Sequence, residues 1–342
     1  MESGMKASAD PVLDWLLEES DPGVRFLAMR DLLDADAEDP SLVAARAETL
    51  NQAPVRDILE AQTPEGYWIE AGPGYLPKYR STLWQVIFLG QFMADGRDVR
   101  IRSAVDYVLE NARAPDGGFS MNGTRSGLIH CLQGNLCSSL IELGFETDMR
   151  LQEALDWMAR SILGEGIAPS SEKKAPVRYL RSGNSGPSFL CSANDHKPCA
   201  WGAVPAIEAL SKVSSHHRTP VIDRAIQAGI EFLLSRDPAV ADYPMGYSEK
   251  PNRSWFKFGY PLGYVCDVLR NVEVLCALGL GKDPRIQNAL EMILNKRDSK
   301  GRWNLEYTYA GKMWGDLGAK GQPNKWVTLR ARRALRHAGV EA

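Results

Sequence analysis

The chain has 342 residues, of which 44% are hydrophobic and 24% charged, a composition typical of a folded globular protein. The formal net charge of −3 and the lack of a long basic run argue against a nucleic-acid-binding surface. The acidic start, residues 1–21, has no apolar signal-peptide core, and the longest apolar run, 83–93, is too short and too polar to span a bilayer. With six cysteines and no export signal, we expect a cytoplasmic protein with free thiols.

Apolar residues recur with the period of an α-helix in six pairs of segments, each pair joining an amphipathic helix to a more apolar one. We expect the amphipathic outer helices near 10–20, 52–62, 98–112, 148–162, 219–235 and 284–296. We expect the more apolar inner helices near 22–35, 79–94, 127–143, 197–212, 262–279 and 324–338. The whole chain, 1–342, is predicted to form one domain, with a short first pair over 1–50 and the main repeats over 51–342. No alternating strand pattern is longer than a few residues.

Two phrases repeat along the chain. "QTPEGYW" (62–68), "RAPDGGF" (113–119) and "RDSKGRW" (297–303) are polar turns with glycine that end in an aromatic residue. The phrases "GRDVRI", "ETDMRL" and "GKDPRI" each place an aspartate where it can cap the next helix. A repeated unit of roughly 50 residues predicts an all-α fold, an (α/α)6 toroid whose inner helices line a central cavity.

The Gly-aromatic turns "EGYW", "DGGF" and "KGRW" resemble those of the terpenoid cyclase and protein prenyltransferase α/α-toroid superfamily. More narrowly, "CLQGNL", "HKPCAWG", "DVLRNVEVL" and "KWVTLRARRAL" are similar to bacterial prenyltransferase and squalene oxidase repeat proteins. The resemblance covers nearly all of the chain after residue 50. It implies a toroid and a small hydrophobic, terpenoid-like or aromatic substrate.

The connections that lead into the inner helices are long, and those that lead out of them are short. The long loops, 63–78, 114–126, 163–196, 237–261 and 297–323, must lie at one rim over the N-termini of the inner helices. They carry most of the chemically unusual residues, so we expect the functional site at this rim.

The stretch "CSANDHKPC" (191–199) crowds reactive side chains at the start of the fourth inner helix. Asp195 could cap that helix, and a helix N-terminus would lower the pKa of Cys199 and make it a thiolate. His196 would complete a proton path. In the alternative interpretation Asp195 is only a cap, Cys199 a small buried residue and His196 a surface residue.

A second cluster, with His130 and Cys131, opens the third inner helix, which neighbours the fourth. His130 or Cys131 could approach the 191–199 stretch, so zinc is the candidate cofactor. Its candidate ligands are Cys131, Cys191, His196 and Cys199. The farnesyltransferase-like zinc site uses Asp, Cys and His, types that Asp195, Cys199 and His196 supply without a matching arrangement.

Asp267, in "YPLGYVCDVLRN", is the candidate general acid, because a carboxyl in an apolar cavity has a raised pKa. The alternative is an ion pair with Arg270, three residues later. The D-x-D-D and D-D-x-x-D motifs of terpene cyclases are absent from the sequence, which argues against cyclisation by either route.

Aromatic residues concentrate in the long loops and in the first turns of the inner helices. Trp68, Phe119 and Trp303 close the glycine turns, and we expect them to be structural. An aromatic wall suits an apolar ligand. The predicted substrate-binding residues are Tyr75, Trp84, Trp201, Trp255, Tyr260, Tyr264, Trp314 and Trp326.

Three hypotheses for function follow. The first is an enzyme that acts on a small hydrophobic molecule in the central cavity by acid–base lyase or isomerase chemistry, with Asp267, His196, Cys199, His130 and Asp195 as catalytic candidates. The second is a zinc-dependent transferase or hydrolase. The third is a non-catalytic binding or scaffold protein, which predicts a narrow or plugged cavity. The sequence leaves the oligomeric state open.

Overall fold

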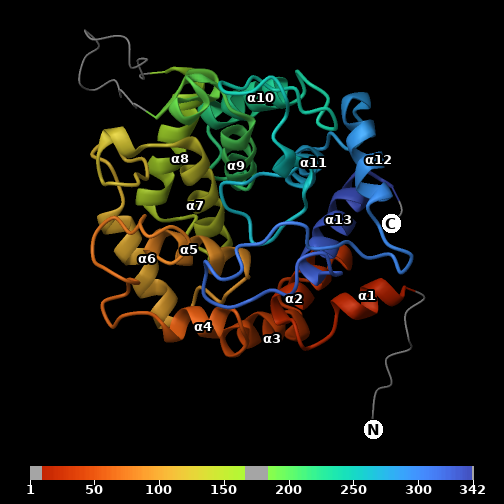
Figure 1. Cartoon of the computed structure of the whole chain (residues 1–342). Coiled ribbons are helices and arrows are strands. Elements are labelled where there is room, and N and C mark those ends of the chain that lie inside the picture. Colours follow the sequence, from red (N-terminus) through yellow and green to blue (C-terminus); the bar gives the residue numbers. More distant parts are fainter. Residues whose placement is uncertain (1–9, 166–183, 341–342) are drawn as a thin grey trace.

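The computed structural model describes residues 10–165 and 184–340, and this part of the chain is mostly helical, as predicted (Figure 1). The α-helices are α1 (Pro11–Leu16), α2 (Pro22–Leu32), α3 (Pro40–Glu48), α4 (Val55–Glu60), α5 (Thr82–Gln91), α6 (Val99–Asn111), α7 (His130–Glu142), α8 (Met149–Leu163), α9 (Ala200–Ser211), α10 (Pro220–Leu233), α11 (Val268–Ala277), α12 (Gln287–Asn295) and α13 (Lys325–His337). Short 3-10 helices are η1 (Thr49–Asn51), η2 (Arg125–Gly127), η3 (Pro187–Phe189), η4 (Ser192–Asn194), η5 (Arg253–Phe256) and η6 (Pro284–Ile286).

The only strands in the described ranges form a small antiparallel sheet in one long loop. Strand β1 (Ser185–Gly186) pairs with β2 (Leu190–Cys191), which pairs with β3 (Lys197–Pro198). Each strand has two residues, so the sheet orders the loop without changing the all-α class.

The aspartates of the repeated phrases cap their helices as predicted. Asp98, Asp148 and Asp283 each accept a hydrogen bond from the backbone N–H two residues later. That later residue is an arginine in all three repeats, and its guanidinium folds back onto the same carboxylate. The Asp-x-Arg triplet therefore begins one outer helix in each repeat.

The aromatic residues that close the glycine turns are structural, which confirms the prediction. The Trp68 indole donates to the Ile58 carbonyl at 2.8 Å, and the Trp303 indole donates to the Ile293 carbonyl at 2.7 Å. Both side chains are fully buried, as is Phe119. Each of these tryptophans ties its loop to the helix ten residues before it, so the two repeats share one local design.

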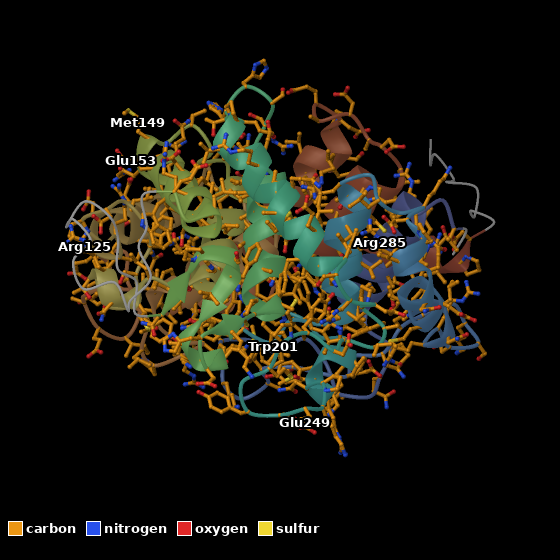
Figure 2. All side chains as sticks on the ribbon, turned by 90° about the horizontal axis from the view of Figure 1, so that it is seen from above. Arg125, Met149, Glu153, Trp201, Glu249 and Arg285 are labelled. Atoms are coloured by element: carbon orange, nitrogen blue, oxygen red, sulfur yellow. The ribbon has the colours of Figure 1, made fainter. Side chains whose placement is uncertain are left out.

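The inner helices pack against one another in sequence. Helix α5 packs against α7, α7 against α9, α9 against α11, and α11 against α13. Helix α13 then packs against α2, so the last helix of the described chain lies beside one of its first helices (Figure 1). Helices α6, α8, α10 and α12 cover this series from outside, and the exposed Met149 at the start of α8 marks the outer surface (Figure 2).

Helices α7 and α9 approach each other closely because α7 has a glycine where the two helices meet. A Cβ placed on Gly134 of α7 would lie 2.3 Å from the backbone carbonyl carbon of Pro205 in α9. Only glycine allows the two backbones to approach this closely.

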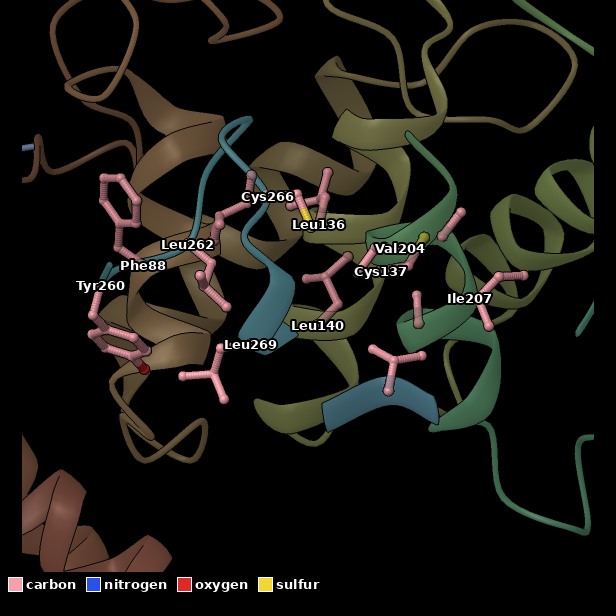
Figure 3. Close-up of a cluster of buried hydrophobic side chains, with 14 of the residues drawn as sticks. Phe88, Leu136, Cys137, Leu140, Val204, Ile207, Tyr260, Leu262, Cys266 and Leu269 are labelled. Carbon is pink, nitrogen blue, oxygen red and sulfur yellow. The ribbon is translucent and has the colours of Figure 1, made fainter. Parts of the chain in front are cut away.

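The space between the inner helices is filled by the chain itself. Residues 258–263, which we call the central segment, are all buried and carry Tyr260 and Leu262 between α5, α7 and α11 (Figure 3). Gln91 of α5 holds Leu262 through both backbone groups, at 2.6 Å each. Asn135 of α7 donates to the Gly263 carbonyl at 3.2 Å. An extended segment thus lies where the sequence predicts an open cavity.

Ion pairs connect five of the inner helices. The pairs are Arg30–Asp31 and Arg30–Glu142, Lys212–Glu142 and Lys212–Glu208, Arg270–Glu208, Arg330–Asp267 and Arg330–Glu273, and Arg333–Glu273 and Arg333–Asp31. Asp267 also accepts from the backbone N–H of Arg270 at 2.7 Å, which completes the circuit. We call these ten residues the charged belt. It runs through α2, α7, α9, α11 and α13.

The helices differ from the predictions in one additional helix and in the starts of two inner helices. Helix α3 is an additional helix, although Asp39 caps it and Pro40 occupies its first turn, a start signal visible in the sequence. The fourth inner helix begins at Ala200 rather than 197, because Lys197 and Pro198 pair in β3. The fifth begins at Val268 rather than 262, because Asp267 is its N-cap and the preceding residues are extended. Within the described residues no helix has the length and apolar character needed to cross a membrane.

Candidate functional site

A pocket of about 660 Å³ opens among the long loops, beside the N-terminal ends of α7 and α9. We call it the rim pocket. Its apolar lining includes Met121, Ile129, Phe189, Leu190, Trp201, Ala241, Tyr243, Pro244, Met245 and Trp255, and its polar lining includes Tyr75, Lys78, His130, Cys131, Cys191, Cys199 and Tyr264. Trp201, at the edge formed by α9, and the loop that carries Glu249 are visible in Figure 2. The lining comes from four of the long loops, as expected for a site at one rim.

Two tyrosines from distant parts of the chain meet in this pocket. The Tyr264 hydroxyl donates a hydrogen bond of 2.8 Å to the Tyr75 oxygen. The ammonium of Lys78 lies 5.2 Å from the Tyr264 ring centre and 5.7 Å from that of Tyr75. Burial raises the pKa of both phenols, so both hydroxyls keep their protons at neutral pH.

His130 lies at the first position of α7 and lines the same pocket. Its Nε2 forms a 2.7 Å hydrogen bond with the Ser161 hydroxyl, and its backbone N–H donates to Ser185 at 2.9 Å. Burial lowers the pKa of His130 to about 4. The imidazole is therefore neutral at physiological pH.

Three thiols from two elements converge in the rim pocket. Cys191 and Cys199 affect each other's pKa, Cys191 raises the pKa of Cys131 of α7, and Cys131 contributes to the raised pKa of Cys199. The hydrogen bond from Cys199 lowers the pKa of Cys191 to about 6, with help from the N–H groups of Ala193 and Asn194. Hydrogen bonding to Cys191 and burial raise the pKa of Cys199. The thiolate is therefore Cys191 and not Cys199, which corrects the sequence-based expectation.

The loop structure explains why Cys191, and not Cys199, is the thiolate. The sequence places Cys199 at the dipole of a helix N-terminus, and it is indeed the N-cap of α9. Its sulfur is nevertheless largely buried, and burial disfavours the charged form. Cys191 is less buried and is the N-cap of η4, and the N–H groups of Ala193 and Asn194 contribute to lowering its pKa.

Asp195 and His196 lie outside the rim pocket. Both are exposed in the turn between β2 and β3, with positive φ angles of 53° and 55°. Asp195 does not cap α9, because β3 and Cys199 separate it from the helix. The structure therefore separates these two residues from His130 and from the tyrosine pair.

Asp267 also lies away from the pocket, and its surroundings are structural. It is 2% exposed, caps α11, and pairs with Arg330 at 2.9 Å. Its second oxygen accepts from Gly259 N–H at 3.1 Å and from Arg330. Both carboxylate oxygens accept hydrogen bonds from donors that belong to the protein itself. No lone pair is left to interact with a substrate. The alternative partner expected from the sequence, the Arg270 side chain, instead pairs with Glu208.

Four of the eight predicted aromatic residues line the pocket: Tyr75, Trp201, Trp255 and Tyr264. Trp84 is buried behind them, where its indole donates to the Tyr75 carbonyl at 2.9 Å and its ring meets Tyr264 edge-on. Tyr260 and Trp326 stack on each other in the interior, with ring centres 4.6 Å apart. Trp314 lies against the guanidinium of Arg80 instead.

The zinc hypothesis finds no coordination group in the described part of the chain. No set of three or more His, Cys, Asp or Glu side chains there is arranged to hold a metal ion. Of the four candidate ligands, Cys131, Cys191 and Cys199 converge, but His196 is exposed in the hairpin turn. All six cysteines are free.

No family model and no curated protein match the chain. Among solved structures, a variant of the type II terpene cyclase MstE from Scytonema in complex with geranylgeranyl dihydroxybenzoate is 14% identical, with a TM-score of 0.34, over 96% of this chain and 99% of that chain. The apo form of MstE is 13% identical, with a TM-score of 0.30, over 85% of this chain and 98% of that chain. A protein from Actinoplanes is 14% identical, with a TM-score of 0.32, over 84% of this chain and 97% of that chain. Superpositions this loose transfer no residue roles, so the site is interpreted from this chain's own side chains.

Sequence reasoning missed the contribution of the hairpin to the pocket. Phe189 and Leu190 bring apolar surface to it, and Tyr243 closes the opposite side. A signal was present for Tyr243, which lies ten residues after Leu233 and donates to its carbonyl at 2.6 Å. This is the same spacing that Trp68 and Trp303 use, so Tyr243 occupies the corresponding place in its repeat.

Proposed function

We propose that this chain is an enzyme that binds a small, largely apolar molecule in the rim pocket and converts it by acid–base chemistry of the lyase or isomerase kind. The observation that carries the proposal is the meeting of the Tyr75–Tyr264 hydroxyl pair and the neutral His130 in an apolar pocket of about 660 Å³. An apolar pocket with a few converging polar groups is the usual form of a small-molecule site.

The tyrosine pair supplies the proton donor in this proposal. Tyr264 donates to Tyr75, so the Tyr75 proton is left to point toward a ligand. Lys78 adds positive charge at the same edge, which favours an electron-rich group on the ligand. His130 is neutral and can accept a proton from the bound molecule.

We also propose that the helices close into a single (α/α)6 toroid domain of the terpenoid cyclase-like superfamily. The charged belt supports this closure, because Arg30 of α2 pairs directly with Glu142 of α7 at 3.1 Å. The belt therefore returns to its starting helix without a break. A reducing, cytoplasm-like compartment belongs to the same proposal, since six unpaired cysteines suit it.

A second candidate is a binding protein for the same class of molecule. The buried central segment favours it, because a filled centre is what the non-catalytic hypothesis predicts. The convergence of proton-carrying groups at the rim favours the enzyme.

The two candidates are separated by binding and turnover assays with farnesol, an apolar terpenoid alcohol, as the probe. Both predict that farnesol changes the tryptophan fluorescence and that Trp201→Ala weakens binding about tenfold, as expected when a buried aromatic contact is lost. Trp314→Ala is the matched control and should bind normally. Only the enzyme predicts products, found by mass spectrometry over a panel of apolar substrates, that Tyr75→Phe abolishes while it preserves binding. Normal farnesol binding by Trp201→Ala would contradict the use of this pocket.

A further inference from the structure

The strands β2 and β3 place two cysteines on one face of a hairpin. Cys191 pairs with Lys197 in the register, and Cys199 lies two residues beyond Lys197. Alternate residues of a strand share a face, so Cys191 and Cys199 are diagonal neighbours whose side chains point the same way. The Cys199 N–H also donates to the Phe189 carbonyl at 3.0 Å, which extends the pairing to the second cysteine.

Both thiols line the rim pocket, and each of them alters the pKa of the other. Both side chains are partly exposed, so a ligand in the pocket can reach them. The apolar side chains around them, among them Phe189, Leu190 and Trp201, favour an apolar ligand.

The two thiols are not equivalent. Cys199 donates its S–H to Cys191, and the N–H groups of Ala193 and Asn194 also stabilise negative charge on the Cys191 sulfur. The titratable groups that act on Cys191 are Cys199 and His196 in the turn, while Cys191 itself raises the pKa of Cys131 of α7. The sulfur that is more exposed is thus the one prepared as a nucleophile, and the more buried sulfur remains protonated beside it.

We propose that Cys191 and Cys199 form a thiol–disulfide exchange site, in which Cys191 attacks and Cys199 resolves, and that its substrate is a small, largely apolar disulfide. This inference concerns the thiols alone and does not depend on the acid–base function proposed above.

The reaction balances in two steps. The Cys191 thiolate attacks one sulfur of the disulfide R–S–S–R, forms a Cys191–S–S–R bond and releases RS⁻, which takes a proton from solvent. Cys199 then loses its proton, attacks the Cys191 sulfur and displaces the second RS⁻. The two cysteines lose two electrons and two protons in total, and one disulfide is reduced to two thiols.

The hairpin geometry indicates that the resulting bond is easily reduced. Diagonal positions in an antiparallel pair have Cα atoms roughly 7 Å apart, near the upper limit for a disulfide. Closing the bond must draw the two strands together. Strained bonds of this kind are the labile, functional ones rather than the permanently structural ones.

Dithiodipyridine, a neutral aromatic disulfide, tests the proposal because each attack releases one coloured thiopyridone. The wild-type chain should release two equivalents in a fast phase, lose two hydrogens in mass, and retain no pyridyl adduct. Cys199→Ser should release one equivalent and keep the pyridyl group on Cys191. Cys191→Ser should lose the fast phase. Circular dichroism checks that each variant is folded.

Two matched controls keep the result specific. Cys137→Ser removes a buried thiol of α7, and Cys276→Ser removes a buried thiol of α11, and both should keep the two-equivalent fast phase. A stable pyridyl adduct on the wild-type chain would overturn the resolving role of Cys199. A fast phase that survives in Cys191→Ser would overturn the attacking role of Cys191.

A measurement on the unmutated chain gives an independent check. Alkylation by iodoacetamide, followed by peptide mapping, should show the Cys191 rate rising through half its maximum near pH 6. Because lower basicity also lowers nucleophilicity, we expect the rate at pH 7 to exceed that of an ordinary exposed thiol only about fourfold. A half-maximum near pH 9 would overturn the proposal. Farnesol binding by Cys191→Ser separates this outcome from a failure of the proposed function.

Discussion

At the scale of single residues, the surroundings of a side chain decide its role more than its type does. Asp267 and His130 are both buried and both were candidates for proton transfer. Asp267 has its donors fixed by Arg330, Gly259 and the α11 backbone, whereas His130 has one hydroxyl partner and lines the rim pocket. Of the two residues, only His130 is placed where a bound ligand could contact it.

The substitution Asp267→Asn separates a structural role from a catalytic one. It leaves Arg330 buried with only Glu273 to neutralise it, so we expect a loss of about 3 to 5 kcal/mol in unfolding free energy. Urea denaturation measures this loss. Asp283→Asn should cost less than about 1 kcal/mol, because asparagine still caps the helix and only a surface ion pair with Arg285 is weakened. Full stability of Asp267→Asn combined with lost turnover would restore Asp267 as the general acid.

His130 makes stability depend on pH in a defined range. Its pKa is about 4 in the folded chain and 6.5 when unfolded, so between these values only the unfolded chain binds the proton. Stability is therefore full above pH 6.5 and falls as the pH drops toward 4, by about 3 kcal/mol in total. The ion pairs of Glu142 lower its pKa to about 2. Its contribution to the unfolding free energy is therefore lost at a lower pH than the pH at which His130 acts.

The replacement His130→Gln should remove most of this decrease in unfolding free energy with falling pH. Unfolding free energies at pH 6.5 and pH 4.5 provide the comparison. His337→Gln is the control, because partial burial lowers the pKa of that histidine as well, and it should remove a smaller part. An unchanged slope in His130→Gln would mean that His130 is already protonated in the folded chain.

At the scale of elements, small sequence signals set where helices begin and how closely they pack. The Asp-x-Arg triplets begin the outer helices, and the loop tryptophans tie each turn to the helix before it. Helix contacts depend on single positions as well. Gly134 is a position at which α7 and α9 approach each other closely.

The substitution Gly134→Ala should force α7 and α9 apart. The added Cβ would lie 2.4 Å from the Ala206 nitrogen, which cannot move without shifting α9. We expect a loss of about 2 kcal/mol in unfolding free energy, measured by thermal or urea denaturation. Gly202→Ala, where the nearest atom lies at 3.7 Å, is the matched helical control and should be neutral or slightly stabilising. Equal behaviour of the two variants would refute the close approach.

At the scale of the whole molecule, the charged belt joins helices that are far apart in sequence. Arg30 belongs to the second helix of the chain and Glu142 to the seventh, yet they pair at 3.1 Å. The belt lies among the inner helices, and the rim pocket lies near the N-terminal ends of α7 and α9, so stability and proposed function are placed in different parts of the molecule.

A double-mutant cycle on Arg30→Ala and Glu142→Ala tests the closure of the helical ring. If α2 and α7 are held together as described, the two changes should couple by about 1 kcal/mol, because both side chains are partly screened by solvent. Unfolding in urea at low salt measures the four chains of the cycle. Arg30→Ala with Asp283→Ala, two residues that share no ion-pair partner, should be additive. Additivity of the first pair as well would indicate an open arrangement of helices.

The sequence by itself determined the all-α class, the repeated caps and the structural tryptophans, because these depend on residues within one or two helical turns of each other. It also placed the candidate site among the long loops, since loop length is visible along the chain. Local patterns missed α3, although its capping signal was present, and they started the fourth and fifth inner helices too early.

Only the tertiary structure decided which of the candidate residues meet. Cys191 rather than Cys199 is the thiolate because the hairpin brings the two cysteines together, Cys199 lowers the pKa of Cys191, and the pKa of the more buried Cys199 is raised. Tyr75 and Tyr264 meet, and the central segment occupies the space between the inner helices, through contacts between residues far apart in sequence. Such contacts follow from packing, which no short stretch of sequence contains.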